Sequence, residues 1–268
     1  MDDWSLSSSM DFGPVTVRVQ NLAQVASFYT DVVGLSAADR SPETIRLESA
    51  STTLIELVHD PECQPRPRES AGLFHVAIRV PTRTALAAAL HRVERHGSLD
   101  GASDHGVSHA LYLTDPDENG VEIYYDRPRS EWPYADGNLR IPTQPLDLDA
   151  LRSHGAYTPR SPADTDIGHI HLEVTDLERS VSFYRDRLGL RVRYAVAGGV
   201  FLAAGDYHHH IGLNTWNHRT APLNGCGLQQ ISIVATIDES RGAQPHPAVD
   251  TVRDPDGIPI QLSVRESS

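Results

Sequence analysis

Alternating apolar and polar positions predict short strands along most of the chain, and stretches with helical spacing interrupt them. Residues 15–19 alternate as a strand does, and a helix capped by Asn21 then runs to about Val33. Shorter alternating stretches follow at residues 44–48 and 53–59. The pattern therefore predicts a strand, a helix and further strands, in that order.

The same order of elements returns after a proline-rich stretch. A strand is expected at residues 74–80 and a helix at about residues 84–96. Two further strands are expected at residues 108–114 and 121–125, with a turn between them at residues 115–120. The chain thus begins with two modules of the type β-α-β-β-β.

The second half of the chain repeats the first at an offset of 155 positions (182 − 27). Residues 27–35 return as residues 182–190, with the same Ser-Phe-Tyr beginning and the same Gly-Leu end. A third module is expected, with its strand at residues 168–174 and its helix at residues 177–188 after Asp176 as cap.

The fourth module is shorter than its counterpart in the first half. The interval from Ile78 to Asp115 spans 37 positions, whereas the equivalent interval from Ile233 to Asp254 spans 21. The 16 missing positions (37 − 21) cover most of the expected helix. The sequence therefore predicts an α+β fold of four modules, of which the last has lost most of its helix.

A stretch rich in proline and aspartate, residues 128–165, separates the two halves. We expect a first domain at residues 12–127 and a second domain at residues 166–265, joined by this linker. A length of 268 residues suits two domains, each large enough to bury a core.

Composition narrows the class of protein. The formal net charge of −13 argues against a nucleic-acid partner. No apolar stretch reaches the 18 residues of a membrane span, and the chain does not begin as a signal peptide does, so we expect a cytoplasmic protein without a membrane partner. Cys63 and Cys226 lie at positions that the repeat does not match, and two reduced thiols are the simplest expectation.

The two halves differ at positions that suit a metal ligand. At the offset of the repeat, His75 faces Gln230, and His169 faces Pro14. A duplicated fold that keeps one site, assembled from both halves, and has lost the other site accounts for this pattern.

The motifs resemble those of the vicinal oxygen chelate superfamily and, within it, the type I extradiol catechol 2,3-dioxygenases. The helix motif around Phe28-Tyr29 and Phe183-Tyr184 is common to the superfamily, whereas the histidine-containing motifs are more specific. These motifs lie at residues 104–108, 115–124, 168–172 and 207–216. The resemblance covers nearly the whole chain and implies two tandem domains whose paired modules form cup-shaped half-barrels.

The resemblance places metal ligands on the first and last strand of each module. The positions so implied are Pro14 and Glu56, His75 and Glu122, His169 with no ligand near Gly212, and Gln230 and Gln261. Pairing of modules within each half gives no cup with two histidines and a carboxylate. Pairing of the second module with the third gives His75, Glu122 and His169, the facial triad of non-haem iron oxygenases. We therefore predict this exchanged pairing.

The resemblance also implies catalytic and substrate-binding residues. Tyr112 matches a tyrosine that contacts a substrate oxygen, and His105 matches a loop histidine that contacts the substrate. His209 fits the acid–base residue of the family, because histidine changes its charge near neutral pH. Its neighbours His208 and His210 are alternatives for this role, and strand alternation would point both of them away from His209.

His171 shares a strand face with His169, so it competes for the ligand role. His171 and His210, together with His105 and Tyr112, are expected to bind the substrate. Taken alone, His75 could be a core histidine, and the run of three histidines could be a surface tract. The combination with Glu122 in an apolar strand favours the functional interpretation, because a buried carboxylate needs a partner or a metal.

We expect an Fe(II)-dependent extradiol dioxygenase, an oxidoreductase that cleaves a small aromatic diol with O₂. Mn(II) is the second choice, because the same ligands accept it. Two other classes stay open: a metal-dependent isomerase or lyase similar to glyoxalase I, and a sequestering protein of the bleomycin-resistance type that binds no metal. Members of the family commonly assemble, and a homo-oligomer is left open, as is a damaged paralogue with a truncated last module.

Overall fold

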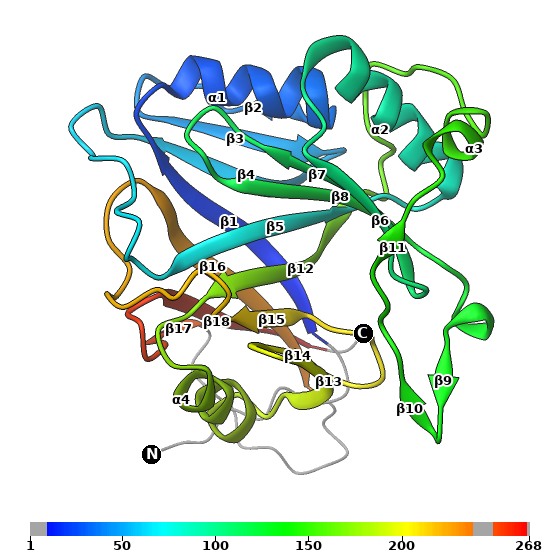
Figure 1. Ribbon diagram of the computed structural model, residues 1–268. Helices are drawn as coiled ribbons and strands as arrows, with labels where there is room; N and C mark the ends of the chain where they lie inside the picture. The colour runs from blue at the N-terminus through cyan, green and yellow to red at the C-terminus, as the bar shows by residue number, and fades with distance from the viewer. Residues whose placement is uncertain (1–9, 238–248, 267–268) are drawn as a thin grey trace.

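The structure is a computed structural model that describes residues 10–237 and 249–266. Most of its strands belong to two large sheets, and a two-stranded hairpin projects from the second (Figure 1). Each large sheet combines one module from the first half of the chain with one from the second half.

The first large sheet has seven strands and joins the first module to the fourth. Its strands, from one edge to the other, are β17 (Val249–Arg253), β18 (Pro259–Glu266), β16 (Gly227–Ile237), β1 (Met10–Val19), β4 (Thr52–His59), β3 (Thr44–Ser49) and β2 (Ser36–Ala38). The first strands of the two modules, β1 and β16, are neighbours and run antiparallel. In the fourth module, most of the helix is expected to be lost. The corresponding stretch includes residues 238–248, which lie outside the described residues.

The second large sheet has nine strands and joins the second module to the third. Its strands, in order, are β11 (Gln144–Pro145), β6 (Gly101–Asp104), β7 (Ser108–Thr114), β8 (Gly120–Asp126), β5 (Gly72–Arg79), β12 (Asp166–Glu173), β15 (Ile211–Asn214), β14 (Gly199–Ala203) and β13 (Arg191–Val196). The antiparallel pairing of β5 with β12 sets His75 opposite His171. The predicted exchange of modules is thus confirmed.

The helices begin where the sequence predicts, because polar side chains cap them. Asn21, Thr82 and Asp176 each accept a hydrogen bond from a backbone N–H of the first helical turn. These residues precede α1 (Leu22–Phe28), α2 (Arg83–His96) and α4 (Leu177–Ser182). Figure 1 shows α1 and α2 along one side of the molecule and α4 at the opposite side.

Two of these helices continue as π-helices, which the sequence pattern did not predict. The segments are η1 (Tyr29–Val33) and η3 (Phe183–Arg187), at equivalent positions of the repeat. Tyr29 and Tyr184 are completely buried at these positions, and each carbonyl accepts a hydrogen bond from a backbone N–H beyond the helix. The wider turn therefore recurs where the Phe-Tyr motif of the repeat recurs.

Strand alternation sorts the side chains of the second large sheet onto two faces. Aliphatic side chains on one face pack into the main core, together with α2: Val76, Ile78, Val121, Ile123, Ile170 and Leu172. The opposite face carries the ionisable and aromatic side chains: His75, Tyr112, Glu122, Tyr124, His169 and His171. The sheet thus forms a core on one side and a polar site on the other.

The expected linker has structure of its own. It contains η2 (Arg129–Glu131), the hairpin of β9 (Tyr134–Ala135) and β10 (Asn138–Leu139), strand β11, and α3 (Leu148–Arg152). β11 pairs with β6 at the edge of the second large sheet, and α3 contacts α2. The buried Arg92 of α2 donates hydrogen bonds to the Val33 carbonyl and to Ser161 Oγ. This stretch is therefore attached along the first half of the chain.

The expectation of two reduced thiols is wrong in this structure, because Cys63 and Cys226 form a disulfide. The backbone N–H of Cys226 donates to the carbonyl of Gln64, so the segment after β4 lies beside the segment before β16. Comparison of the two halves relates only equivalent positions of the repeat. It therefore could not indicate a contact between Cys63 and Cys226, which are not at equivalent positions. Within the described residues, no helix is both long enough and apolar enough to cross a membrane.

We predict that Gly168→Ala destabilises the fold, because a Cβ at residue 168 would lie 1.7 Å from the hydroxyl oxygen of Tyr124. The side chain or backbone has to shift to remove this overlap. This shift should lower the free energy of unfolding by about 1–3 kcal/mol, as measured by urea denaturation. Gly101→Ala is the matched control, since its nearest neighbour would lie at 3.9 Å. The control should stay within about 1 kcal/mol of the wild type. Equal stability of the two variants would contradict the prediction.

Candidate metal centre

Three adjacent strands bring the predicted ligands together. Glu122 of β8 and His169 of β12 both lie opposite Ala77 of the central strand β5. His75 precedes Ala77 by two residues and so lies on the same face of the sheet. The small side chain of Ala77 leaves room for Glu122 and His169 to meet across it.

The three side chains converge on one point. His75 Nε2 and His169 Nε2 each lie 3.0 Å from Glu122 Oε2. One ligand atom from each residue lies within 4.8 Å of the other two, and the described residues contain no second group of this kind. His75 Nε2 is buried and lacks a hydrogen-bond partner of good geometry. A divalent metal ion bound by the three residues would satisfy this nitrogen, so the donor set fits a metal.

Burial and neighbouring charges favour the metal-binding protonation states of Glu122 and His169. Burial alone would raise the pKa of Glu122, but His169 and His75 outweigh burial and hold that pKa well below its ordinary value. Burial lowers the pKa of His169 to about 4, against the opposing effect of Glu122. A carboxylate and a neutral imidazole are the forms that coordinate metals.

Tyr112 and His105 lie beside the triad and contact each other. Tyr112 pairs with Glu122 between β7 and β8, and its hydroxyl lies 2.7 Å from His105 Nε2. His105 Nδ1 lies 2.9 Å from the carbonyl oxygen of Pro142. Since a carbonyl only accepts, His105 Nδ1 carries the proton, and Nε2 accepts from the tyrosine hydroxyl. Burial, with a smaller effect of Glu122, raises the pKa of Tyr112 well above its ordinary value.

The run of three histidines differs from its predicted conformation. Residues 208–210 form bends before β15 instead of a strand, so strand alternation does not explain their directions. His209 lines the cavity next to the triad, and its ring centroid lies 4.2 Å from that of His169. His208 is fully buried behind it and contacts Asp126.

His210, which is expected to bind the substrate, lies away from the triad. His210 Nδ1 accepts a hydrogen bond from the backbone N–H of Ala204, and its ring lies 4.9 Å from that of Tyr207. The residue does not line the cavity. The bend at residues 208–210 turns His209 towards the triad and His210 away from it.

His171 lines the cavity but does not belong to the group of ligands. Its ring lies against Gly212, where a Cβ would come within 2.7 Å of it. The rings of Phe74 and Trp216 surround it at 5.1 and 5.3 Å. Its buried Nε2 has no hydrogen-bond partner, and burial lowers its pKa well below the ordinary value. His171 is therefore placed to contact a molecule in the cavity.

The triad lies in the wall of a cavity of about 370 Å³, a size that suits a small molecule. Apolar and aromatic side chains make up much of the lining: Phe74, Val107, Ile141, Tyr194, Val196, Phe201 and Trp216. The polar lining residues are His75, Ser103, His105, Ser108, Tyr112, Glu122, Thr143, His169, His171 and His209. The cavity therefore combines a polar wall at the triad with apolar surroundings.

The equivalent positions in the first large sheet hold no such group. Gln230 Nε2 donates to Gln261 Oε1, and Arg46 forms an ion pair with Glu56 at 3.3 Å. The polar side chains at these positions thus have partners within the protein. This agrees with the prediction of one complete ligand set per chain.

Comparison with known proteins identifies the family. The family model described as the Glyoxalase/Bleomycin resistance protein/Dioxygenase superfamily matches residues 11–123 and 166–236. The chain belongs to this superfamily. Within it, a protein of Bacillus subtilis (strain 168) named catechol-2,3-dioxygenase is 38% identical over 245 residues, which are 88% of this chain and 86% of that protein. The sequence resemblance to catechol 2,3-dioxygenases is thereby confirmed.

Solved structures support the superfamily fold. Glyoxalase I from Zea mays matches with a TM-score of 0.58 and 18% identity, over 96% of this chain and 92% of that chain. A proposed dioxygenase from Bacillus subtilis matches with a TM-score of 0.64 and 15% identity, over 98% of this chain and 86% of that chain. At such identities the likeness concerns the fold alone.

Several residues of the site were missed in the sequence. Ile141 and Thr143 of the expected linker line the cavity, and no local pattern marks them as pocket residues. Asp126 contacts His208 from the same strand as Glu122. Its spacing of four residues from Glu122 places it on the same strand face, and this signal could have identified it.

We predict that Ala77→Val weakens metal binding, because a branched side chain would occupy the space in which Glu122 and His169 meet. The dissociation constant should rise at least roughly tenfold, as measured by competition with a coloured chelator. Ala195→Val is the control, since Ala195 is exposed in β13 of the same sheet. Wild-type affinity in a folded Ala77→Val protein would show that the ligands do not depend on this space.

Proposed function

We propose that the protein is an Fe(II)-dependent extradiol dioxygenase that cleaves the ring of a catecholic compound with O₂. The convergence of His75, Glu122 and His169 at one wall of the cavity carries this proposal. The catechol-2,3-dioxygenase from Bacillus subtilis supports the reaction class, since it is 38% identical over most of both chains. Mn(II) is the second choice of metal, because the same three donors accept it.

The three ligands would hold the metal and leave several coordination positions for other molecules. A bound Fe(II) supplies a site at which both substrate oxygens and O₂ can bind together, with electrons available for O₂. The protein contributes the geometry around it. The ligands lie on three paired strands, which hold their spacing more firmly than loops would.

Residues beside the triad would bind and orient the catechol. The hydroxyl of Tyr112 and the ring of His171 lie in the cavity wall, within reach of a molecule near the triad. His105 Nε2 accepts a hydrogen bond from the Tyr112 hydroxyl and so fixes the direction of this hydroxyl. The rings of Phe74, Phe201 and Trp216 offer apolar contacts for the aromatic ring and limit the access of water.

His209 would move the protons of the reaction. Its ring lines the cavity, and burial followed by the nearby His169 and His208 keeps its pKa well below the ordinary value. A neutral imidazole can accept a proton from a catechol hydroxyl and return it to the ring-opened product. His208 and His210 are not available for this role, because neither lines the cavity.

The test is oxygen uptake, with a simultaneous visible spectrum, after protein loaded with Fe(II) is mixed with simple catechols. Oxygen consumption matched by a yellow ring-fission product would support extradiol cleavage. Bound iron without oxygen uptake across a panel of catechols would favour an isomerase or lyase. Tight ligand binding without any bound metal would favour a sequestering protein.

Two variants should separate metal binding from proton transfer. Glu122→Ala should lose the metal, because it removes the central donor of the triad. His209→Ala should keep the metal and lower kcat by roughly 100-fold or more, because a general base is lost. Metal content by atomic absorption and oxygen uptake measure the two effects. Retained iron and full activity in Glu122→Ala would refute the triad.

The lining of the cavity supports a substrate without a negatively charged substituent. None of the described lining residues is an arginine, and the chain contains no lysine. A carboxylate in this cavity would therefore lose water without gaining a cationic partner. The net charge of −13 also disfavours the approach of anions.

We predict that kcat/KM for 4-methylcatechol exceeds that for 3,4-dihydroxybenzoate by at least roughly tenfold, because the carboxylate would be buried unpaired. Oxygen uptake at several substrate concentrations measures both values. Val196→Arg should narrow the ratio, since Val196 lines the cavity, is 40% exposed and would supply the missing cation. A wild-type preference for the carboxylated catechol would contradict the prediction.

A further inference from the structure

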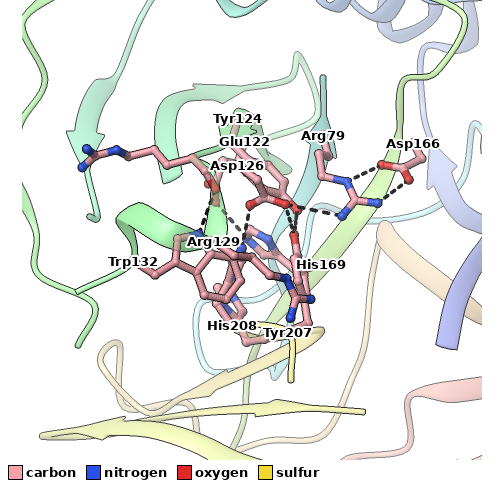
Figure 2. A network of polar contacts seen from close by, with 12 residues as sticks. Arg79, Glu122, Tyr124, Asp126, Arg129, Trp132, Asp166, His169, Tyr207 and His208 are labelled. Atoms are coloured by element: carbon pink, nitrogen blue, oxygen red, sulfur yellow. Dashed lines mark hydrogen bonds and ion pairs between the residues drawn. The ribbon is translucent and has the colours of Figure 1, made fainter. Parts of the chain in front are cut away.

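A chain of hydrogen bonds leads from His209 to the partly buried carboxylate of Asp126 behind the cavity. His209 Nδ1 lies 2.7 Å from His208 Nδ1, and His208 Nε2 lies 2.9 Å from Asp126 Oδ1. Figure 2 shows His208 in this network, close to Asp126 and the ring of Tyr207. His208 is completely buried and does not line the cavity. Its ring therefore connects His209 to Asp126 and has no contact with the substrate.

The surroundings of Asp126 determine the direction of these hydrogen bonds. Tyr207 donates its hydroxyl proton to Asp126 Oδ2 at 2.8 Å, and Arg79 donates to the same oxygen at 3.4 Å. Since the proton of Tyr207 is used in this way, the hydroxyl of Tyr124 donates to Tyr207 at 2.7 Å. The carboxylate of Asp126 is thus surrounded by donors and acts only as an acceptor.

The tautomers of the two histidines follow from this acceptor. His208 Nε2 donates to Asp126, so in a neutral His208 ring, the form that this inference assigns to it, Nε2 carries the only ring proton. His208 Nδ1 is then an acceptor, and the atom 2.7 Å away, His209 Nδ1, has to carry the proton that they share. His209 Nε2 is consequently the ring nitrogen without a proton.

We propose that Asp126 and His208 are positioning residues that hold His209 as its Nδ1–H tautomer and leave Nε2 free to accept a proton from the substrate. This inference rests on the proposed function, because it explains how His209 serves as the base. The hydroxyl proton of the catechol moves to Nε2, and the resulting imidazolium keeps its Nδ1–H bond to His208. A carboxylate that orients a catalytic histidine is a recurring arrangement in enzymes.

The Asp126→Asn variant should reverse the order of donors and acceptors. Oδ2 of Asp126 faces two donors, Arg79 and Tyr207, whereas Oδ1 faces only His208. The amide oxygen of asparagine should therefore take the place of Oδ2, which turns the NH₂ group towards His208. His208 Nε2 then becomes an acceptor, its Nδ1 becomes a donor, and His209 is left with its proton on Nε2.

The direct test is a long-range ¹H–¹⁵N spectrum of protein labelled at histidine and loaded with Zn(II), a diamagnetic ion that the same donors bind. The His209 signals are assigned by their loss in His209→Gln. The wild type should show a protonated Nδ1 and an unprotonated Nε2, and Asp126→Asn should show the reverse. A protonated Nε2 in the wild type would overturn the proposal, and so would an unchanged tautomer in folded Asp126→Asn.

Kinetics with Fe(II) provide the second test. Asp126→Asn and His208→Phe should lower kcat by roughly 10–100-fold, with KM and metal content close to those of the wild type. Asp206→Asn is the matched control, because it also replaces a carboxylate by an amide near His208, but Asp206 is exposed, pairs with Arg193 and lies outside the path to His209. It should keep kcat near the wild-type value. Folded Asp126→Asn and His208→Phe proteins with wild-type kcat would overturn the proposal.

The two tests separate this inference from the proposed function. The spectrum reports the proton on His209 without any turnover. The wild type could show the expected tautomers and still never consume oxygen. This result would refute the proposed dioxygenase function and, with it, the catalytic role of the His209 tautomer. A protonated Nε2 in a wild-type protein that cleaves catechols would refute the inference alone.

Discussion

The antiparallel pairing of β5 with β12 is the constraint on which the site depends. This pairing joins two modules that are separated in sequence by the whole segment between residues 79 and 166. It places His75 on one strand and His169 on the other, and the parallel neighbour β8 adds Glu122. The ligands thus come from both halves of the chain. A metal ion held by all three would bind only where the two strands are paired, so its binding energy would add to the stability of their association.

The sequence predicts this part of the molecule well, because the repeat relates each position in one half of the chain to a definite position in the other half. The offset of 155 positions shows that His75 and His169 have no histidine at their equivalent positions. One complete ligand set then requires the exchange of modules, and alternation along the strands puts the three donors on one face. The helix caps Asn21 and Asp176 were equally predictable, because each is a local contact within four residues.

Other features depend on contacts that neither the repeat nor alternation can indicate. The disulfide of Cys63 with Cys226 joins two loops that are adjacent only in the folded molecule. The bend at residues 208–210 is set by the packing of His208 and Tyr207 around Asp126, so strand alternation gave the wrong conformation for the run. The π-helical turns at Tyr29 and Tyr184 likewise lie outside any simple periodicity.

The stretch between the two halves has a consequence for how the cavity can diversify. It covers one edge of the second large sheet, places Ile141 and Thr143 in the cavity wall, and supplies the Pro142 carbonyl that fixes His105. The strands that carry the triad need a fixed register, whereas a covering segment tolerates substitutions and changes in length. The strands that carry the triad and the stretch that covers the sheet edge thus form different parts of the cavity wall. Substitutions in this stretch can therefore change the shape of the cavity, while the sheet that carries His75, Glu122 and His169 stays unchanged.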